Sequence, residues 1–415
     1  MRRSCINQSS SVLILLIFLL IGCAEIKQPV HHDYSDNVNC SPINGLIILT
    51  EFPDALHEKA GLFSISKRVD REFAQKVFFG HLNKYVQEMS YGKFCIKGTI
   101  TDHWVKLPKP VSYYRTPPKN YETNRKNVGK LIVDTIKNVD KNINFSDYDF
   151  VAIFLAATVS EYGTTGLCGY PGAFRKQRFL RIVKKRTGHM INGGVAIFSY
   201  QAHLGTVFHD IAHVLGGVEN GIRHLPHTYD NEIASKPGLT AGESFIKSQI
   251  NMGLWDPMSC HDCDTPPFLP PGITSWTKLK LGWLDHKKVK TVKPGESATI
   301  ILDPLEEPSS EILAVKIPIS KNTYYLIENR QPIGYDKRLP NHGVLIMYAD
   351  DRISMCTHGK APAKLMNANP LIDRLRGAAF DLGEKEYFVD FENRIRIKLL
   401  QTIHNSYKIL IEPNN

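Results

Sequence analysis

Hydrophobic residues recur every three or four positions in two long segments, which predicts two amphipathic helices. The first helix is expected from Asp70 to Met89, ending before Gly92, and the second from about Thr123 to Val139. Short apolar runs and alternating segments predict strands at residues 46–49, 94–105 and 150–155.

The chain beyond about residue 301 has a strand-rich pattern, with expected strands at 324–327, 344–348, 395–400 and 407–411. Seven basic residues between Arg175 and Arg186 are interleaved with Phe179, Leu180, Ile182 and Val183, which favours a solvated strand or hairpin with one apolar face. A patch for lipid headgroups or polyanions is the alternative. Helices before residue 285 and strands after it predict an α+β fold with a β-rich C-terminal part.

The N-terminus has the parts of an export signal. Arg2 and Arg3 precede an apolar run from Val12 to Ile21, which is too short to cross a bilayer as a mature helix. The ending Leu-Ile-Gly-Cys23 resembles the lipobox of bacterial lipoproteins, which implies removal of residues 1–22 and a lipid anchor on Cys23. The following Ala24 favours the outer membrane, and residues 23–42 read as a tether.

Composition and charge exclude several classes of protein. The 415 residues are 42% hydrophobic and 22% charged, which excludes a disordered, collagenous or multi-span membrane protein. The formal charge of +10 becomes +8 after removal of the two arginines of the signal, 10 − 2. Because the mature chain is exported, we expect no nucleic-acid partner, and an anionic envelope surface is its expected neighbour.

Cysteine usage fits an exported chain. Cys5 is lost with the signal and Cys23 carries lipid, which leaves an even number of cysteines: Cys40, Cys95, Cys168, Cys260, Cys263 and Cys356. These allow disulfides, but the sequence does not choose among the possible pairings. The pair in Cys260-His-Asp-Cys263 could instead form a metal knuckle, although no second pair stands at matching spacing.

Candidate chemistry lies in the segment from Thr206 to Gly216. His209 and His213 are four residues apart, so on a helix both imidazoles project from one face, near enough to hold one metal ion. Such a pair arises by chance about 0.6 times in a chain with this many histidines. The flanking residues are apolar nearly all round, however, which predicts a buried helix, and buried imidazoles need partners.

From this point the chain resembles the immune inhibitor A type of secreted bacterial zinc metallopeptidases, whose signature is His-Glu-x-x-His-x-x-Gly followed by Leu-Pro-Asp-x-Tyr-Asp. The counterparts here are His209-Asp210-x-x-His213-x-x-Gly216 and, after an insertion, the stretch 225–230. Further landmarks are at residues 89–93, 255–259, 280–284 and 325–330. The resemblance implies a zincin-like domain over residues 43–350 with an active-site helix, a β-rich extension over 351–415, bound Zn²⁺, and hydrolysis of protein or peptide substrates.

Two departures from the family pattern matter. Asp210 replaces the family glutamate and is one methylene shorter, so its carboxylate lies roughly 1.5 Å farther from the water it would deprotonate. The insertion, around residues 217–224, also leaves more than one residue as the counterpart of the third zinc ligand. Alignment on Leu-Pro makes His227 the first choice, and Glu219 and Asp230 remain alternatives.

Other landmark residues are expected to support the site. Met258 occupies the position of the methionine turn beneath the metal of related enzymes, where it would pack and not ligate. Glu328 and Arg330 are expected to form a structural ion pair. His203 and His224 read as packing or surface histidines.

The sequence thus favours a lipid-anchored zinc endopeptidase of the cell envelope, with His209, His213 and His227 as ligands and Asp210 as acid and base. The alternative is a binding lipoprotein on an impaired peptidase scaffold, in which zinc would act only as a structural link. Asp210 is the feature that separates the two.

Overall fold

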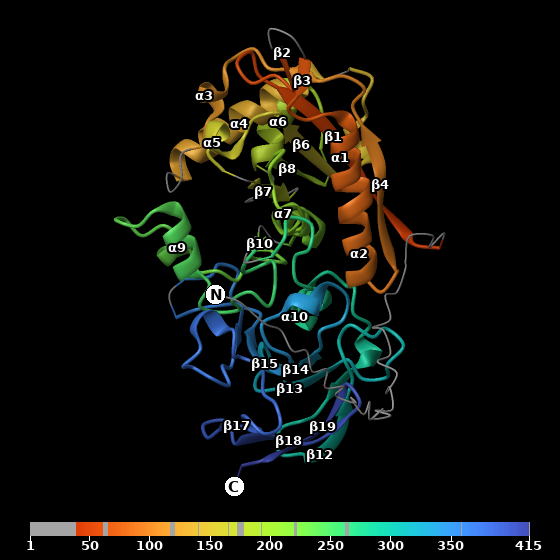
Figure 1. Ribbon diagram of the computed structural model, residues 1–415, viewed down its shortest axis with the longest axis vertical. Helices are drawn as coiled ribbons and strands as arrows, with labels where there is room; N and C mark the ends of the chain where they lie inside the picture. Colours follow the sequence, from red (N-terminus) through yellow and green to blue (C-terminus); the bar gives the residue numbers. More distant parts are fainter. Residues whose placement is uncertain are drawn as a thin grey trace, which may run out of the picture.

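The computed structural model describes residues 39–60, 65–116, 121–139, 141–164, 166–171, 178–191, 193–219, 222–261, 265–357 and 359–414. An upper part is built on a mostly parallel sheet and a lower part on two antiparallel sheets (Figure 1), so the expected mixed α+β class is confirmed. The expected signal, Cys23 and most of the tether lie outside the described residues. Within the described residues, no helix has the length and apolar character needed to span a membrane.

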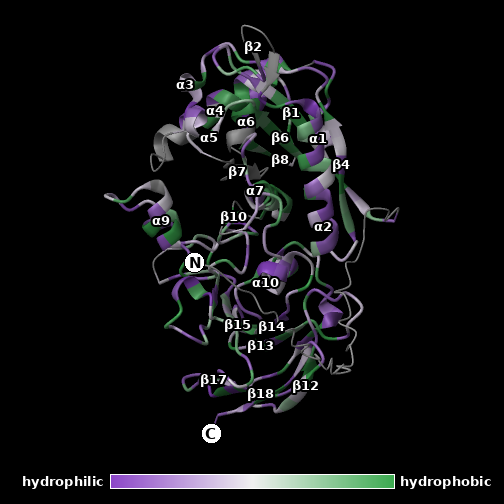
Figure 2. Cartoon of the chain, viewed as in Figure 1, coloured by the Kyte–Doolittle hydropathy of each residue, from purple (hydrophilic) through white to green (hydrophobic). Residues whose placement is uncertain are grey.

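The upper sheet contains the strands expected near residues 46 and 150. Its order is β4 (Phe94–Ile100), β1 (Ser41–Glu51), β6 (Phe150–Leu155), β8 (Gly194–Ser199) and β7 (Gly166–Pro171), with the short β5 (Val105–Lys106) also pairing with β1. Only β7 runs antiparallel to its neighbour. In β1, Ile47 and Leu49 enter one core and Leu46 and Ile48 the other. A sheet buried on both faces explains why its strands read as continuous apolar runs (Figure 2).

Helices cover both faces of this sheet. The first expected helix is one continuous helical stretch with a π-helical middle, α1 (Arg71–Gln75), η1 (Lys76–Leu82) and α2 (Asn83–Met89), and the Asp70 side chain caps its start by accepting from Phe73 N. It shares one core with α7 (Leu204–Gly216). The second expected helix is α4 (Tyr121–Asn138), in the core of the opposite face. Short helices complete this part: α3 (Val111–Tyr114), η2 (Phe145–Asp147) and α5 (Val159–Tyr162).

The strand or hairpin expected between Arg175 and Arg186 is wrong, because the described part of this segment is helix α6 (Arg178–Thr187). Val183 is fully buried in the core beside α4, whereas its neighbour Ile182 is exposed. Basic residues fill the last helical turn, where the helix dipole favours cations. Docking of one apolar stripe against α4 therefore decided between helix and strand.

The lower part is a sandwich of two antiparallel-rich sheets. One has the order β11 (Val289–Thr291), β13 (Ala314–Pro318), β14 (Thr323–Arg330), β15 (Gly343–Asp350) and β16 (Ala363–Leu365); the other has the order β12 (Ala298–Leu302), β19 (Ser406–Pro413), β18 (Ile395–Ile403) and β17 (Tyr387–Asp390). Their facing side chains form a separate core. The division expected at residue 350 falls between β15 and β16, which pair in one sheet.

Strand β14 joins the two parts because both of its faces are buried. Leu326 packs in the upper core and Ile327 in the sandwich core. The expected ion pair between Glu328 and Arg330 is confirmed, with Nη1 3.3 Å from Oε1. Arg330 also contacts Asp336 in η4 (Gly334–Arg338) and Glu306. Its guanidinium donates to the carbonyls of Trp255 and Gly272, so one buried cation ties the lower sheet to the loops beneath α7.

The landmark residues near Met89 contact α10 (Ser275–Lys280) and the segment that follows it. Lys278 is buried, donates to the Met89 carbonyl at 2.6 Å and lies 4.1 Å from the Tyr91 ring centroid. Lys93 donates to the Trp283 carbonyl. These landmarks therefore hold α2 against the helix that follows the methionine-turn segment.

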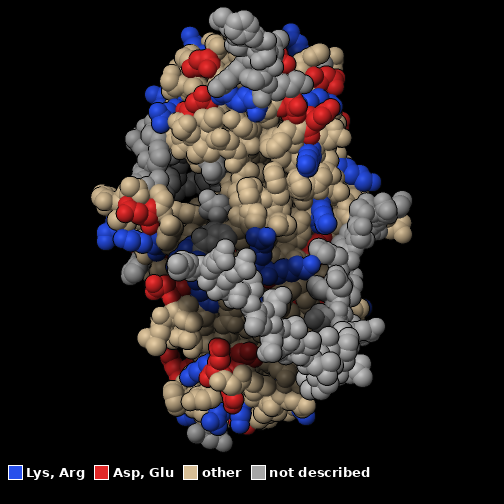
Figure 3. All heavy atoms as spheres, in the orientation of Figure 1, with Lys and Arg blue, Asp and Glu red and all other residues tan. Residues whose placement is uncertain are grey.

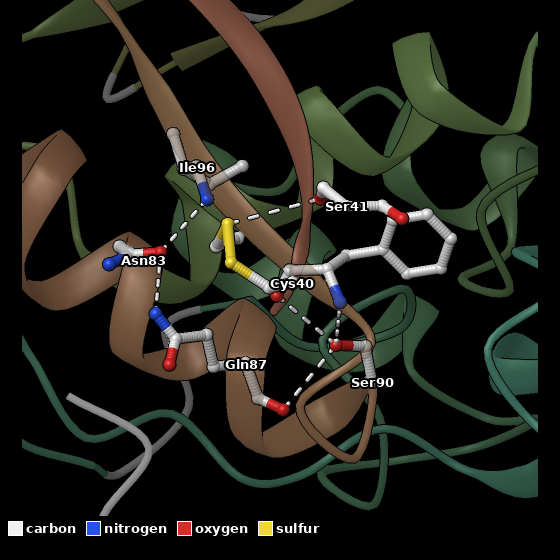
Figure 4. The surroundings of a disulfide bond; sticks show 8 residues. Cys40, Ser41, Asn83, Gln87, Ser90 and Ile96 are labelled. Carbon is white, nitrogen blue, oxygen red and sulfur yellow. Dashed lines mark hydrogen bonds between the residues drawn. A yellow bond between two sulfur atoms is a disulfide. The ribbon is translucent and has the colours of Figure 1, made fainter. Parts of the chain in front are cut away.

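A disulfide between Cys40 and Cys95 joins the start of β1 to β4 (Figure 4). Nearby, Asn83 accepts from the backbone of Ile96 and from the side chain of Gln87, which fixes α2 to the same strand. Cys260 is also disulfide-bonded, and Cys356 is a buried free thiol. The remaining short elements are β2 (Glu58–Ala60), β3 (Ile65–Lys67), β9 (Val218–Glu219), β10 (Ile222–Arg223), α8 (Asn231–Ala234), α9 (Ala241–Ser248), η3 (His286–Lys288) and η5 (Asp373–Leu375).

Candidate metal centre

Helix α7 carries the two histidines expected to bind metal, and nearly all of it is buried, as its apolar flanks predict. His209 and His213 lie on one face of the helix, and their Nε2 atoms are 3.0 Å apart. The rings are nearly perpendicular, with centroids separated by 4.6 Å. The two imidazoles therefore converge on one point.

The hydrogen bonds of the opposite ring nitrogens fix which atoms carry lone pairs. His209 Nδ1 is 2.8 Å from the Pro257 carbonyl and His213 Nδ1 is 2.8 Å from the Leu225 carbonyl. A carbonyl oxygen only accepts, so both Nδ1 atoms must be the donors, and in the neutral rings both Nε2 atoms carry lone pairs. Two lone pairs that face each other at this distance repel, and a shared cation is the partner that suits them.

The hydrogen bond between His213 and the Leu225 carbonyl explains two landmarks of the sequence, Gly216 and the Leu225-Pro226 stretch. At Gly216, an added Cβ would lie 2.7 Å from Leu225 Cβ, so glycine at this position lets the Leu225 segment approach the helix and orient His213. The Leu225-Pro226 stretch therefore contributes a backbone oxygen to the centre. Carbonyl acceptors of this kind commonly set the tautomer and direction of metal-binding histidines.

The turn around Met258 lies beneath His209. The Asp256 carboxylate accepts from Met258 N and from both the backbone and the hydroxyl of Thr274. Burial raises the pKa of Asp256 while these hydrogen bonds oppose the shift. Met258 is fully buried. The contact with His209 comes from the carbonyl of Pro257, so the turn supports the imidazole through its backbone.

The expected third ligand, His227, lies beside the pair. Its ring centroid is 6.1 Å from that of His213, and the ring stacks on Tyr229 at 4.2 Å. Both ring nitrogens are buried without a hydrogen bond of normal geometry, and Asn231 offers a polar contact that favours the charged ring. Within the described part of the chain, no group of three or more His, Cys, Asp or Glu is already arranged to hold a metal ion.

The two alternatives for the third ligand differ in what the structure says of them. Asp230 caps helix α8, and its Oδ1 accepts from the backbone of Glu232 and Ile233. That geometry is the usual one of a helix cap. Glu219 lies in β9, and its side chain is outside the described residues.

Burial keeps the clustered imidazoles neutral. It lowers the pKa of His209 and His213 well below the ordinary value, helped by neighbouring positive charges, and the backbone hydrogen bonds only partly oppose this. Burial likewise lowers the pKa of His227 and of His261 to about 3. Neutral imidazoles have the lone pair that a metal ion requires.

The other expected site residues are spread around this pair. Asp210 follows His209 on α7 and is 4% exposed. His203 caps the start of α7 by accepting from Gly205 N, which confirms its structural role. His224 is exposed, as expected of a surface histidine. The metal-knuckle alternative is wrong for Cys260, because a disulfide sulfur is not a thiolate ligand.

A cavity of about 290 Å³ lies between β10 and the lower sheet, and its lining includes none of the clustered imidazoles. Arg223 lines it, and its charge also lowers the pKa of His213 and His227. The opposite wall includes Asp350 at the end of β15 and an ion pair between Lys280 of α10 and Asp351, 2.9 Å apart. On the face shown in Figure 3, basic and acidic side chains are intermingled at both ends of the molecule. The cavity is therefore polar and brings one arginine close to the imidazoles.

Sequence reasoning missed three features of the centre. It did not place His261 beside His209, it did not identify the Pro257 and Leu225 carbonyls as partners, and it did not associate Arg223 with the histidines. A histidine three residues after Met258 was the only available signal for the first. The other two depend on backbone positions that no residue type reveals.

No protein-family model matches the chain, and no curated protein matches it.

Proposed function

We propose that the protein is a zinc-dependent metalloendopeptidase of zincin-like fold, related to the immune inhibitor A type, that hydrolyses extracytoplasmic proteins. The observation that carries this proposal is the convergence of His209 and His213, with Nε2 atoms 3.0 Å apart and both Nδ1 atoms committed to carbonyls. Two imidazole nitrogens on one tetrahedral zinc ion lie about 3.3 Å apart, so the pair fits such an ion after a small movement.

The motifs of the resemblance support the same proposal because each has a physical role at the centre. Gly216 admits Leu225, and Leu225 orients His213. Pro257, within the methionine turn, orients His209. A helical His pair that takes its carbonyl partners through both Nδ1 atoms leaves both Nε2 atoms facing each other, which is the arrangement of a metal-binding helix.

Bound zinc would lower the pKa of a water molecule and polarise the scissile carbonyl. Asp210 would take a proton from the attacking water and deliver it to the leaving amine. Arg223, whose charge reaches the imidazoles, would stabilise negative charge that develops on the carbonyl oxygen. The cavity that Arg223 lines would hold a part of the substrate remote from the scissile bond, because none of the imidazoles lines it.

Asp210 also favours a second candidate function, a binding lipoprotein on an impaired peptidase scaffold. General-base assistance contributes about 10² to 10⁴ in rate, so an aspartate that falls short of the water could abolish most activity. In that case the zinc would remain as a link between α7 and its loops.

The deciding experiment measures zinc content and cleavage of an unfolded general protein substrate by the full-length chain purified in detergent. We expect about one equivalent of zinc, and cleavage that is lost on chelation and in His213→Ala. Less than about half an equivalent in the wild type, under conditions that preserve such sites, would refute the metal centre. If the wild type binds zinc without cleaving and Asp210→Glu creates activity, the scaffold function is correct.

We also propose that the protein is anchored to the cell envelope by lipid on Cys23, in the outer membrane if the cell has one. The support is the sequence Leu-Ile-Gly-Cys23-Ala24 alone. Mass spectrometry of the mature N-terminal peptide should find a diacylated Cys23, and Cys23→Ser should release the chain from the membrane fraction. An unmodified N-terminus elsewhere in the chain would contradict the anchor.

A further inference from the structure

A fourth histidine lies at the proposed centre, partly exposed and on a segment to which the sequence assigned no role there. His261 follows the turn of Met258, and its ring centroid is 4.9 Å from that of His209. The distance between the rings of His209 and His213 is nearly the same, 4.6 Å. His261 Nδ1 is buried and has no hydrogen-bond partner among the described residues.

The close approach of His261 to α7 depends on the residue one helical turn before His209. At Gly205, an added Cβ would lie 2.0 Å from the His261 carbonyl oxygen, so only glycine admits this segment. The preceding residue is held by a backbone hydrogen bond from Cys260 to Asp256 and by the disulfide of Cys260. The His261 ring also packs on Phe245 at 4.7 Å. Its position is therefore fixed from several sides.

Each candidate for a third ligand contacts a different ring of the pair, His261 that of His209 and His227 that of His213. Imidazoles bound to one ion have centroids about 4.5 to 5.2 Å apart, for bond angles between a right angle and the tetrahedral angle. The separation of His209 and His261 lies in this range. The 6.1 Å between His213 and His227 lies outside it, and His227 stacks on Tyr229 in that position.

We infer that His261 is a ligand of the same metal ion as His209 and His213, in the place expected for His227. This inference rests on the proposed function, because it needs a metal at the pair. The metal then joins three imidazoles from two segments, α7 and the loop after Met258. Tyr229 and His227 would lie beside the ion and face the substrate.

The experiment compares metal binding by the full-length wild type with that of His261→Ala, His227→Ala and the control His224→Ala. His224 is exposed and only three residues from His227, so its loss should leave the affinity within about twofold. Zinc affinity is measured by competition with a chromophoric chelator, and coordination by the visible absorption of the cobalt-substituted protein. We expect His261→Ala to weaken zinc binding by at least about 100-fold and to change the cobalt spectrum, and His227→Ala to do neither.

Because His261→Ala could fold poorly, X-ray absorption of zinc-loaded His227→Ala provides a second measurement that keeps His261. Three imidazole ligands are expected in this variant, and two would overturn the inference. It is also overturned if His261→Ala keeps the wild-type affinity and spectrum while His227→Ala loses them. A wild type that binds no zinc refutes the proposed function itself, which is a distinct result.

Discussion

Replacement of Arg330 by methionine tests whether one buried cation holds the two parts of the molecule together. The side chain is fully buried and lies 2.6 Å from Asp336, 3.2 Å from Glu306 and 3.3 Å from Glu328. Methionine keeps much of the volume but leaves three carboxylates without their cation and two carbonyls without a donor. Removal of one partner from a buried ion pair costs about 3–5 kcal/mol. That is a large part of the ~5–15 kcal/mol by which a domain is normally stable.

The loss should depend on pH in a defined direction. Burial already raises the pKa of Glu306 and Glu328, and Arg330 opposes that rise, so its removal raises both further. A carboxyl whose folded pKa exceeds its unfolded pKa binds protons more readily when folded, so stability increases as pH falls towards the unfolded value. The deficit of Arg330→Met relative to the wild type should therefore shrink by about 1–3 kcal/mol between pH 7.5 and 5.5.

Urea denaturation followed by tryptophan fluorescence is a suitable assay, since both Trp255 and Trp276 are buried and the Trp255 carbonyl accepts from Arg330. The matched control is Arg352→Met, because Arg352 pairs with Asp350 at 2.7 Å but has a side chain 64% exposed. Exposed pairs contribute about 0–1 kcal/mol. Equal losses in the two variants, or a deficit in Arg330→Met that is the same at both pH values, would show that the reasoning about the buried cation is wrong.

Three further predictions concern single residues near the centre. Burial lowers the pKa of Lys278 to about 8, below its value in the unfolded chain, so its charge opposes folding below pH 8 and this cost disappears as pH rises past about 10.5. Between pH 7.5 and 9.5 the free energy of unfolding of the wild type should therefore increase by about 2 kcal/mol relative to that of Lys278→Met. A difference between the two proteins that is the same at both pH values in urea denaturation would contradict this. Arg223→Met should lower kcat/KM by about 10- to 100-fold, because it removes the cation proposed to stabilise the carbonyl oxygen. Zinc binding should not weaken, because the same cation repels the metal. A weaker zinc affinity in a chelator competition would assign Arg223 a different role. Gly216→Ala should displace Leu225 from His213. The free energy of unfolding, measured by urea denaturation, should fall by about 1–3 kcal/mol, and the zinc affinity should fall as well. An unchanged zinc affinity would show that the Leu225 carbonyl does not orient the His213 ring.

The pattern of apolar residues was sufficient to predict helices with one buried face and strands buried on both faces. The amphipathic stretch from Asp70 to Met89 and the apolar run 150–155 formed as expected, because periodicity alone decides which face can be buried. The segment 178–187 was misjudged, since its apolar residues at 179, 180, 182 and 183 have the spacing of a helix and not of a strand. Contact of Val183 with the core beside α4 selected the helix, and that contact exists only in the folded chain.

The sequence by itself determined the pair His209 and His213, since four-residue spacing on a helix places both rings on one face. It also determined the buried ion pair of Glu328 and Arg330. Only the tertiary structure decided what meets these residues. The carbonyls of Pro257 and Leu225, and the His261 ring, reach α7 from loops 12 to 52 positions away, through close approaches that Gly205 and Gly216 permit. The identity of a side chain determines whether it can be a metal ligand. Its hydrogen-bond partners depend on the position of backbone segments that are distant in the sequence, and packing of the folded chain determines that position.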